Sequence, residues 1–156
     1  MKKCIAGLLA LVLLLSGCGA AEEKKETAPL DVAALYTQLE AVGVPQMLAL
    51  DANMQLDLYG IRAEDVKQAK VAVASDGLLA DEIWLLEAID EETAQSIKEL
   101  AEGRIRQKDR ESVTYSPEQN AIVKKSYTEV AGNYVFFICS PEVEAMKNAV
   151  QTALGK

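Results

Sequence analysis

The side chain best placed for a covalent reaction is the thiol of Cys18, which ends the sequence Leu15-Ser16-Gly17-Cys18. This tetrapeptide has the pattern of a bacterial lipobox, in which diacylglycerol is attached to the cysteine sulfur and a peptidase then cleaves before that cysteine. It follows two lysines and an uncharged apolar run over residues 5–15. That run is about half of the roughly 20 apolar residues that a membrane-spanning helix needs, so it is typical of a cleaved signal peptide.

The sequence therefore predicts a signal peptide over residues 1–17 and a lipid anchor on Cys18, which would hold the protein at the outer face of the cytoplasmic membrane. The alternative is an ordinary secretory signal in which the cysteine is incidental. Residues 18–29 are small and charged and lack an apolar period. They predict a flexible acidic tether, followed by one globular domain over residues 30–156.

The net charge of the mature chain limits the kinds of partner that it would bind. Cleavage would remove two of the 16 basic residues and none of the 24 acidic ones, so the mature chain of 139 residues would carry a net charge of −10. Phosphates would repel such a chain, so nucleic acid is not an expected partner. Anionic lipid headgroups would likewise disfavour a domain lying flat on the membrane.

The chain has no histidine, which excludes histidine metal sites and catalysis by Ser-His-Asp or Cys-His groups. Cys4 would leave with the signal and Cys18 would carry lipid, so Cys139 has no disulfide partner. Its neighbours are apolar, which predicts an inert, buried thiol. We expect no metal and no cofactor. Asp51 begins a pattern like a calcium loop, but Leu56 replaces the required glycine and Arg62 the required acid.

Two charged clusters could carry a function. Six acids between residues 81 and 92 could supply paired carboxylates for hydrolysis of a glycan, although acids at the start of a helix are also expected structurally. The second cluster is basic and could bind an anionic wall polymer or an acidic envelope protein; it comprises Arg104, Arg106, Lys108, Arg110, Lys124 and Lys125. Its alternative is a solvated helix end that compensates the helix dipole. Trp84 could stack on a sugar or pack in the core.

Local patterns predict the elements that would position these residues. Helical spacing follows possible N-caps at Asp31, Asp51 and Asp90, with an alternating strand as the second interpretation after Asp51. Arg104, Arg106, Lys108 and Arg110 of the basic cluster fall in the expected last turns of the helix after Asp90. Strands are predicted over 71–74, 83–89, 121–130 and 134–139, and a last helix follows Ser140-Pro141.

The resulting fold class is α+β: N-terminal helices followed by two ββα units, which form a four-stranded antiparallel sheet with helices packed on it. The two units resemble each other. They are either a distant internal repeat or two copies of an arrangement that is common in proteins. Residues 134–139 are apolar on both sides of their strand, which indicates that both faces of the sheet are covered. We expect the two ββα helices on one face and the N-terminal helices on the other. A second subunit is the alternative cover.

Several short motifs appear in a fixed order after the lipobox and tether. They are Leu58-Tyr59-Gly60-Ile61, Ala80-Asp81-Glu82-Ile83, Gln107-Lys108, Tyr115-Ser116-Pro117 and Gly132-Asn133-Tyr134-Val135. In this order the chain resembles the small bacterial lipoproteins of domain of unknown function 4358, over essentially all of residues 30–154. The resemblance implies one domain and an extracytoplasmic location. It implies no activity and no functional residues.

We therefore expect a lipid-anchored accessory or binding module without enzymatic activity, which acts through a surface. Its partners would be the membrane, through Cys18, and an envelope protein or wall polymer. One alternative is a small envelope hydrolase that uses carboxylates, and a deep pocket with two facing acids of displaced pKa would favour it. The other alternative is a structural homodimer formed through the apolar sheet face.

Overall fold

The computed structural model describes residues 29–156, so the lipobox residues Leu15, Ser16, Gly17 and Cys18 lie outside the described part. The helices are α1 (Val32–Gly43), α2 (Ala52–Tyr59), α3 (Glu91–Tyr115), α4 (Pro117–Val123) and α5 (Val143–Ala153), with a 3-10 turn at Ala63–Asp65. The strands are β1 (Met47–Ala49), β2 (Val66–Ala74), β3 (Glu82–Ala88), β4 (Tyr127–Ala131) and β5 (Tyr134–Cys139).

All five strands form one antiparallel sheet in the order β1-β2-β3-β5-β4. Strands β3 and β5 are mostly apolar, and their side chains enter a hydrophobic layer on each face of the sheet. One layer contains Trp84 and Phe137, and the other contains Leu85 and Phe136. The α+β class and the double-sided cover of the sheet are therefore confirmed.

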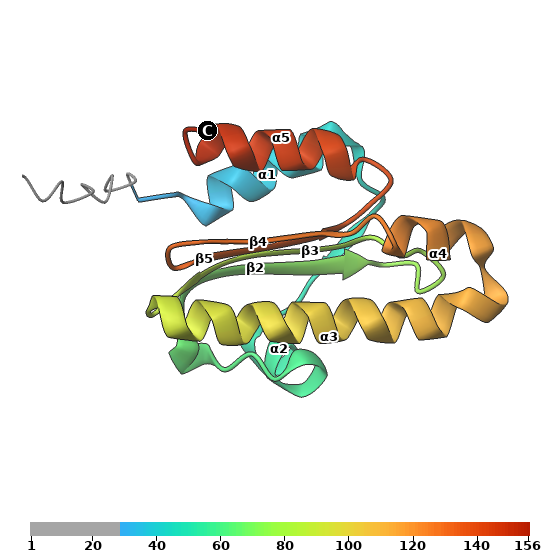
Figure 1. Ribbon diagram of the computed structural model, residues 1–156, viewed down its shortest axis with the longest axis horizontal. Helices are drawn as coiled ribbons and strands as arrows, with labels where there is room; N and C mark the ends of the chain where they lie inside the picture. Colours follow the sequence, from blue (N-terminus) through green and yellow to red (C-terminus); the bar gives the residue numbers. More distant parts are fainter. Residues whose placement is uncertain (1–28) are drawn as a thin grey trace, which may run out of the picture.

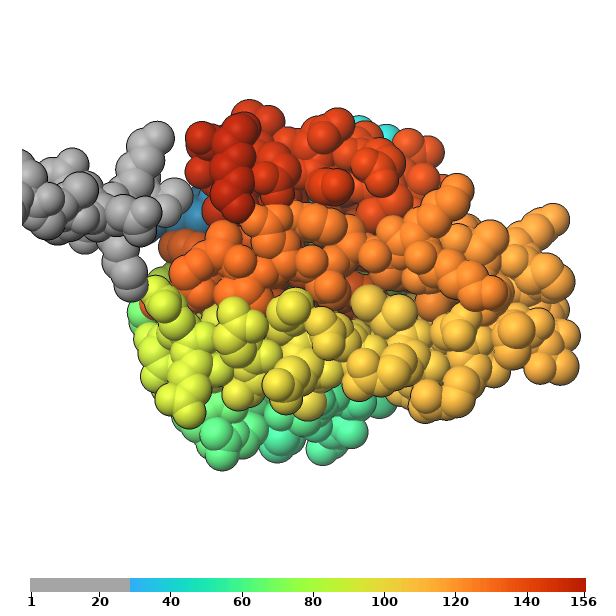
Figure 2. Space-filling model, in the orientation of Figure 1, coloured from blue at the N-terminus to red at the C-terminus, as the bar shows by residue number. Residues whose placement is uncertain are grey.

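The helices that cover each face differ from the expectation. Helices α1 and α5 lie together on one face, and α2 and α3 lie on the other (Figure 1). The two ββα helices are thus on opposite faces, because the 25-residue α3 extends along its whole face. The apolar stripe of α5 packs beside α1 instead. Figure 2 shows β4 at the surface between α3 and α5. Within residues 29–156, the helices of the chain itself cover both faces of the sheet.

The prediction of four strands was wrong in two places. The fifth strand, β1, has only three residues between two helices, too few for an alternating pattern to be recognised, and pairs with β2 through Met47 and Ala74. Residues 121–123 are helical instead of extended, because Ser116 caps α4 and Pro117 occupies its first turn. The predicted hairpin is confirmed, since β4 and β5 pair around a turn at Gly132, which adopts φ +57°.

The three predicted helix caps are confirmed. Asp31, Asp51 and Asp90 each accept a hydrogen bond from the backbone N–H three residues later, at 2.9, 2.9 and 2.7 Å. Asp51 therefore caps α2, and the alternative of a strand in this stretch was wrong. Gly60 ends α2 in the left-handed conformation with φ +76°, which a glycine adopts at little cost.

The folded domain is tied to its first described residues at one end of the sheet. The Leu30 N–H donates to the Tyr134 hydroxyl at 2.9 Å, and Gln68 donates to the Leu30 carbonyl at 3.3 Å. Gln68 also donates to Glu87 at 2.7 Å, close to the start of α3. Leu30 therefore enters the domain at the end of the sheet where α3 begins, on the opposite face.

Candidate functional site

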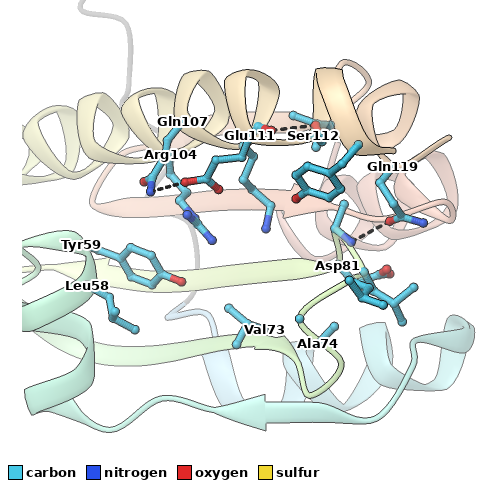
Figure 3. Close-up of a pocket in the computed structure, with 17 residues that line it drawn as sticks. Leu58, Tyr59, Val73, Ala74, Asp81, Arg104, Gln107, Glu111, Ser112 and Gln119 are labelled. Carbon is cyan, nitrogen blue, oxygen red and sulfur yellow. Dashed lines mark hydrogen bonds between the residues drawn. The ribbon is translucent and has the colours of Figure 1, made fainter. Parts of the chain in front are cut away.

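A pocket of about 280 Å³ opens between α3 and the loop that joins β2 to β3 (Figure 3). Helix α3 forms one wall, and Leu58 and Tyr59 of α2 lie opposite it. Loop residues 77–81 and Gln119 of α4 close one end. The lining mixes charged, amide and hydroxyl groups with aliphatic side chains, as small-molecule sites do.

The wall of the pocket rests on a buried carboxylate. Glu82 is fully buried, and its Oε2 accepts hydrogen bonds from Lys108 Nζ at 2.7 Å and Arg104 Nε at 3.0 Å. Its Oε1 accepts from Trp84 Nε1 at 2.9 Å. Arg104 and Lys108 are one helical turn apart on α3, so both side chains reach the same point on β3. Removing a charge from water is costly, and this carboxylate is compensated by two cations.

An aromatic group supports the same cluster. The Trp84 ring lies edge-on to Phe137 at 5.2 Å and 4.6 Å from the Tyr59 ring. The Arg104 guanidinium lies 5.4 Å from the centre of the Tyr59 ring, within the range of a cation–π interaction. Burial and the neighbouring Glu82 charge raise the pKa of Tyr59, so its hydroxyl stays protonated. Tyr59 thus joins the pocket to the core.

Asp81 is the second buried acid of the site. Only 4% of the residue is exposed, and its Oδ1 has no hydrogen-bond partner in the described part of the chain. Burial raises the pKa of the Asp81 carboxyl, and a hydrogen bond with Ser140 and the nearby Lys108 charge oppose that shift. Each buried, unpartnered oxygen costs free energy, so Asp81 Oδ1 requires an explanation.

The remaining polar lining is only partly occupied. Gln107 donates to one oxygen of Glu111 at 2.7 Å, and Gln119 accepts from the Ala80 N–H at 2.7 Å (Figure 3). The Ser112 hydroxyl is used within the helices: it donates to the Lys108 carbonyl and accepts from Asn120. The amide oxygen of Gln107, the amide nitrogen of Gln119 and the second oxygen of Glu111 have further hydrogen-bonding capacity.

The predicted basic surface is divided between two sides of α3. Arg104 and Lys108 point inward to Glu82, so their assignment to an exposed partner surface was wrong. Arg106 and Arg110 are exposed on α3, and Lys124 and Lys125 are exposed beyond α4. The prediction that Arg104–Arg110 compensate the helix dipole was also wrong, because α3 continues to Tyr115 and its last turn has no basic residue.

The other residues that the sequence singled out serve the fold. Trp84 is fully buried, which confirms core packing over an exposed sugar-stacking face. Cys139 is also fully buried, and burial raises the pKa of its thiol to about 11, as predicted for an inert cysteine. Among the acids of residues 81–92, Asp90 caps α3 and Glu87 pairs with Lys67 at 3.6 Å. Within the described residues, no cluster of three or more acids or cysteines could hold a metal ion.

The pocket residues of α4 and α2 were not predicted from the sequence. Gln119 and Tyr59 come from segments 60 residues apart, and no local pattern joins them. A signal for the buried cluster was present, however. Glu82 alternates in phase with the apolar Trp84 and Leu86 of β3, and a charged residue on a buried strand face requires a partner.

Comparison with known proteins identifies one family. No curated protein and no solved structure matches the chain significantly. Between residues 29 and 156, no helix combines the length and apolar character needed to cross a membrane. The model of one family, a domain of unknown function (DUF4358), matches residues 40–140, which is more than half of the chain and includes all of the described pocket. The chain therefore belongs to the DUF4358 family.

Proposed function

We propose that this protein is a lipid-anchored binding module without enzymatic activity at the outer face of the cytoplasmic membrane, and that it binds a small molecule in the α3 pocket. The observation that carries the proposal is a pocket of about 280 Å³ whose charged lining is fixed by the buried Glu82 cluster. A lining held in this way is organised before a ligand arrives, which reduces the entropic cost of binding. The lipobox supports the location.

Binding is favoured over hydrolysis by the positions of the acids. Both oxygens of Glu82 are occupied by Trp84, Arg104 and Lys108, so this carboxylate is not available to transfer a proton to a substrate. One observation favours the second candidate, a hydrolase that uses carboxylates: burial raises the pKa of Asp81, which lines the same pocket as Glu111.

Exposed leucines provide a test of the pocket that leaves its buried charges intact. Leu58 and Leu78 line the pocket and are 60% and 71% exposed, whereas Leu56 is 47% exposed and lies on the same helix as Leu58 without lining the pocket. Native mass spectrometry of the full-length protein, purified from its own cells, should show a small-molecule adduct. Leu58→Glu and Leu78→Glu should remove the adduct, and Leu56→Glu should retain it.

Equal adducts in all three variants would contradict a role for the pocket. The hydrolase alternative predicts turnover instead of a stable adduct. Purified protein should then cleave wall glycan or peptide fragments over time, and both Asp81→Asn and Glu111→Gln should stop the cleavage. Turnover with this dependence would replace the proposal of a binding module.

The anchor has an independent test. Cys18→Ala removes the sulfur that would accept diacylglycerol, so the variant should lose radiolabelled palmitate and leave the membrane fraction or remain unprocessed. Cys139→Ala is the matched control, because this cysteine is buried in the domain and should not change labelling. Undiminished lipid labelling of Cys18→Ala would refute the lipobox assignment.

A further inference from the structure

We infer that the ligand of the α3 pocket is a small zwitterion, namely a molecule that carries one free ammonium group and one free carboxylate, such as an amino acid or a very short peptide. This inference rests on the proposed binding function and specifies its ligand class. Three features of the pocket support it: spare donors on one side, spare carboxylate oxygens on the other, and charged groups of both signs in the lining.

The donors suit a carboxylate. Arg104 uses its Nε for Glu82, which leaves the terminal guanidinium nitrogens beside the Tyr59 ring. Lys108 Nζ has three N–H donors, and its bond to Glu82 uses one of them. Both residues line the pocket. A guanidinium and an ammonium that converge on one site match the charge and geometry of a carboxylate ligand.

The acceptors suit an ammonium group. Asp81 lines the pocket, is 96% buried and has no partner for its Oδ1 among the described residues. Glu111, also in the lining, has one oxygen bonded to Gln107 and a second with capacity for a donor. Because this oxygen is buried, a ligand N–H reaches it only when the Asp81 side chain rotates toward the pocket. A bound ammonium would thereby satisfy a buried acceptor that the protein leaves unpaired.

The charges distinguish this class from other small polar ligands. Arg104 and Lys108 stand against Glu82, Asp81 and Glu111, so the site has an excess of one negative charge. A phosphate would increase that excess, and a neutral sugar would offer no charged group to either the acids or the cations. The ammonium group of a zwitterion would pair with the acids, and its carboxylate would pair with the cations. The volume of about 280 Å³ lies below that of most drug-sized sites, which favours a small ligand.

Blocked analogues test both ligand charges without changing the protein. Isothermal titration calorimetry of the full-length protein would compare L-leucine, L-leucyl-L-leucine, N-acetyl-L-leucine and L-leucinamide. Leucine is chosen because Leu58, Val73 and Leu78 give the pocket an apolar part. We expect leucine or the dipeptide to bind, and each blocked analogue to bind at least about tenfold more weakly, since each loses a charge-assisted hydrogen bond. If leucine binds more tightly than the dipeptide, the ligand is a free amino acid; if the dipeptide binds more tightly, the ligand is a short peptide.

One variant assigns the ammonium side. Glu111→Gln should weaken leucine and leucinamide but not N-acetyl-leucine, because only the first two have an ammonium group. Glu118→Gln is the matched control, as this acid is exposed on α4 outside the lining. Arg104 and Lys108 are not used as test variants because they hold Glu82, and the blocked carboxylate of leucinamide probes their side instead.

Three outcomes would overturn the inference. Equal affinity of leucine and either blocked analogue would show that one ligand charge is not recognised. Binding of N-acetylglucosamine or inorganic phosphate, with no binding of the leucine probes, would replace the ligand class while leaving the proposed binding function in place. Failure of every leucine probe would also refute the class, and the proposed function would still be judged separately by the adduct experiment with Leu58→Glu and Leu56→Glu.

Discussion

The buried cluster around Glu82 allows a sharp test of how the pocket wall is held. Glu82→Gln keeps the size of the side chain, and its amide oxygen can still accept the Trp84 Nε1–H bond. The substitution removes the charge that Arg104 and Lys108 share, at 3.0 and 2.7 Å. Breaking a buried ion pair by removing one partner costs about 3–5 kcal/mol. Because 18% of the Arg104 side chain is exposed and can be hydrated, we expect about 3 kcal/mol.

Urea unfolding of the full-length protein, followed by circular dichroism, measures this free energy of unfolding. The matched control is Glu87→Gln on the same strand, where the ion pair with Lys67 is 3.6 Å long and its lysine is half exposed. We expect that control to cost less than about 1 kcal/mol. Adding Lys108→Met to Glu82→Gln should recover part of the loss, since one uncompensated cation is then gone. Equal costs for Glu82→Gln and Glu87→Gln would refute the reasoning.

Three further predictions concern residues around the same helix and sheet end. Burial raises the pKa of the Asp81 carboxyl in the folded protein above its ordinary value of 3.8. Ionisation of this carboxyl therefore destabilises the folded protein at higher pH, and the effect disappears below pH 3.8. Asp81→Asn should therefore raise the melting temperature at pH 7 by an amount that shrinks toward pH 3.8; growth of the difference on acidification would contradict this assignment. Cys139 should resist iodoacetamide at pH 8 in the native protein and react after unfolding, because its thiol is buried and has a pKa of about 11; peptide mapping would detect early labelling. Arg106→Glu and Arg110→Glu should each change the free energy of unfolding by less than about 0.5 kcal/mol, because both side chains are exposed. A large loss in either variant, measured by the same urea unfolding, would place that residue in an interaction absent from the structure.

Local signals were sufficient for most of the fold. The caps at Asp31, Asp51 and Asp90 were predictable because an N-cap bond joins residues three positions apart. Strand β5 was predictable from its unbroken apolar run. Strand β1 was not, since three residues that pair with β2 across a helix and a turn leave no periodic pattern.

The site depended on contacts that are distant in sequence. The four clustered basic residues of α3, from Arg104 to Arg110, look alike in the sequence. Yet Arg104 and Lys108 face Glu82, which lies 22 and 26 residues earlier. Helical spacing alone separates this pair from Arg106 and Arg110, but only the position of β3 shows which pair turns inward. The pocket further requires α2 and α4 to meet the loop between β2 and β3, and no neighbouring residues encode that meeting.

The attachment of Leu30 to Tyr134 and Gln68 has a mechanical consequence. These bonds lie at the end of the sheet where α3 begins, whereas the pocket lies along the later turns of α3, from Arg104 to Tyr115. At about 1.5 Å per residue, 13 to 24 residues of helix separate the two places by roughly 20–36 Å. A force that pulls the chain at Leu30 would load α1 and its hydrogen bonds first. The pocket would therefore keep its shape while the domain is dragged or held at its N-terminal end.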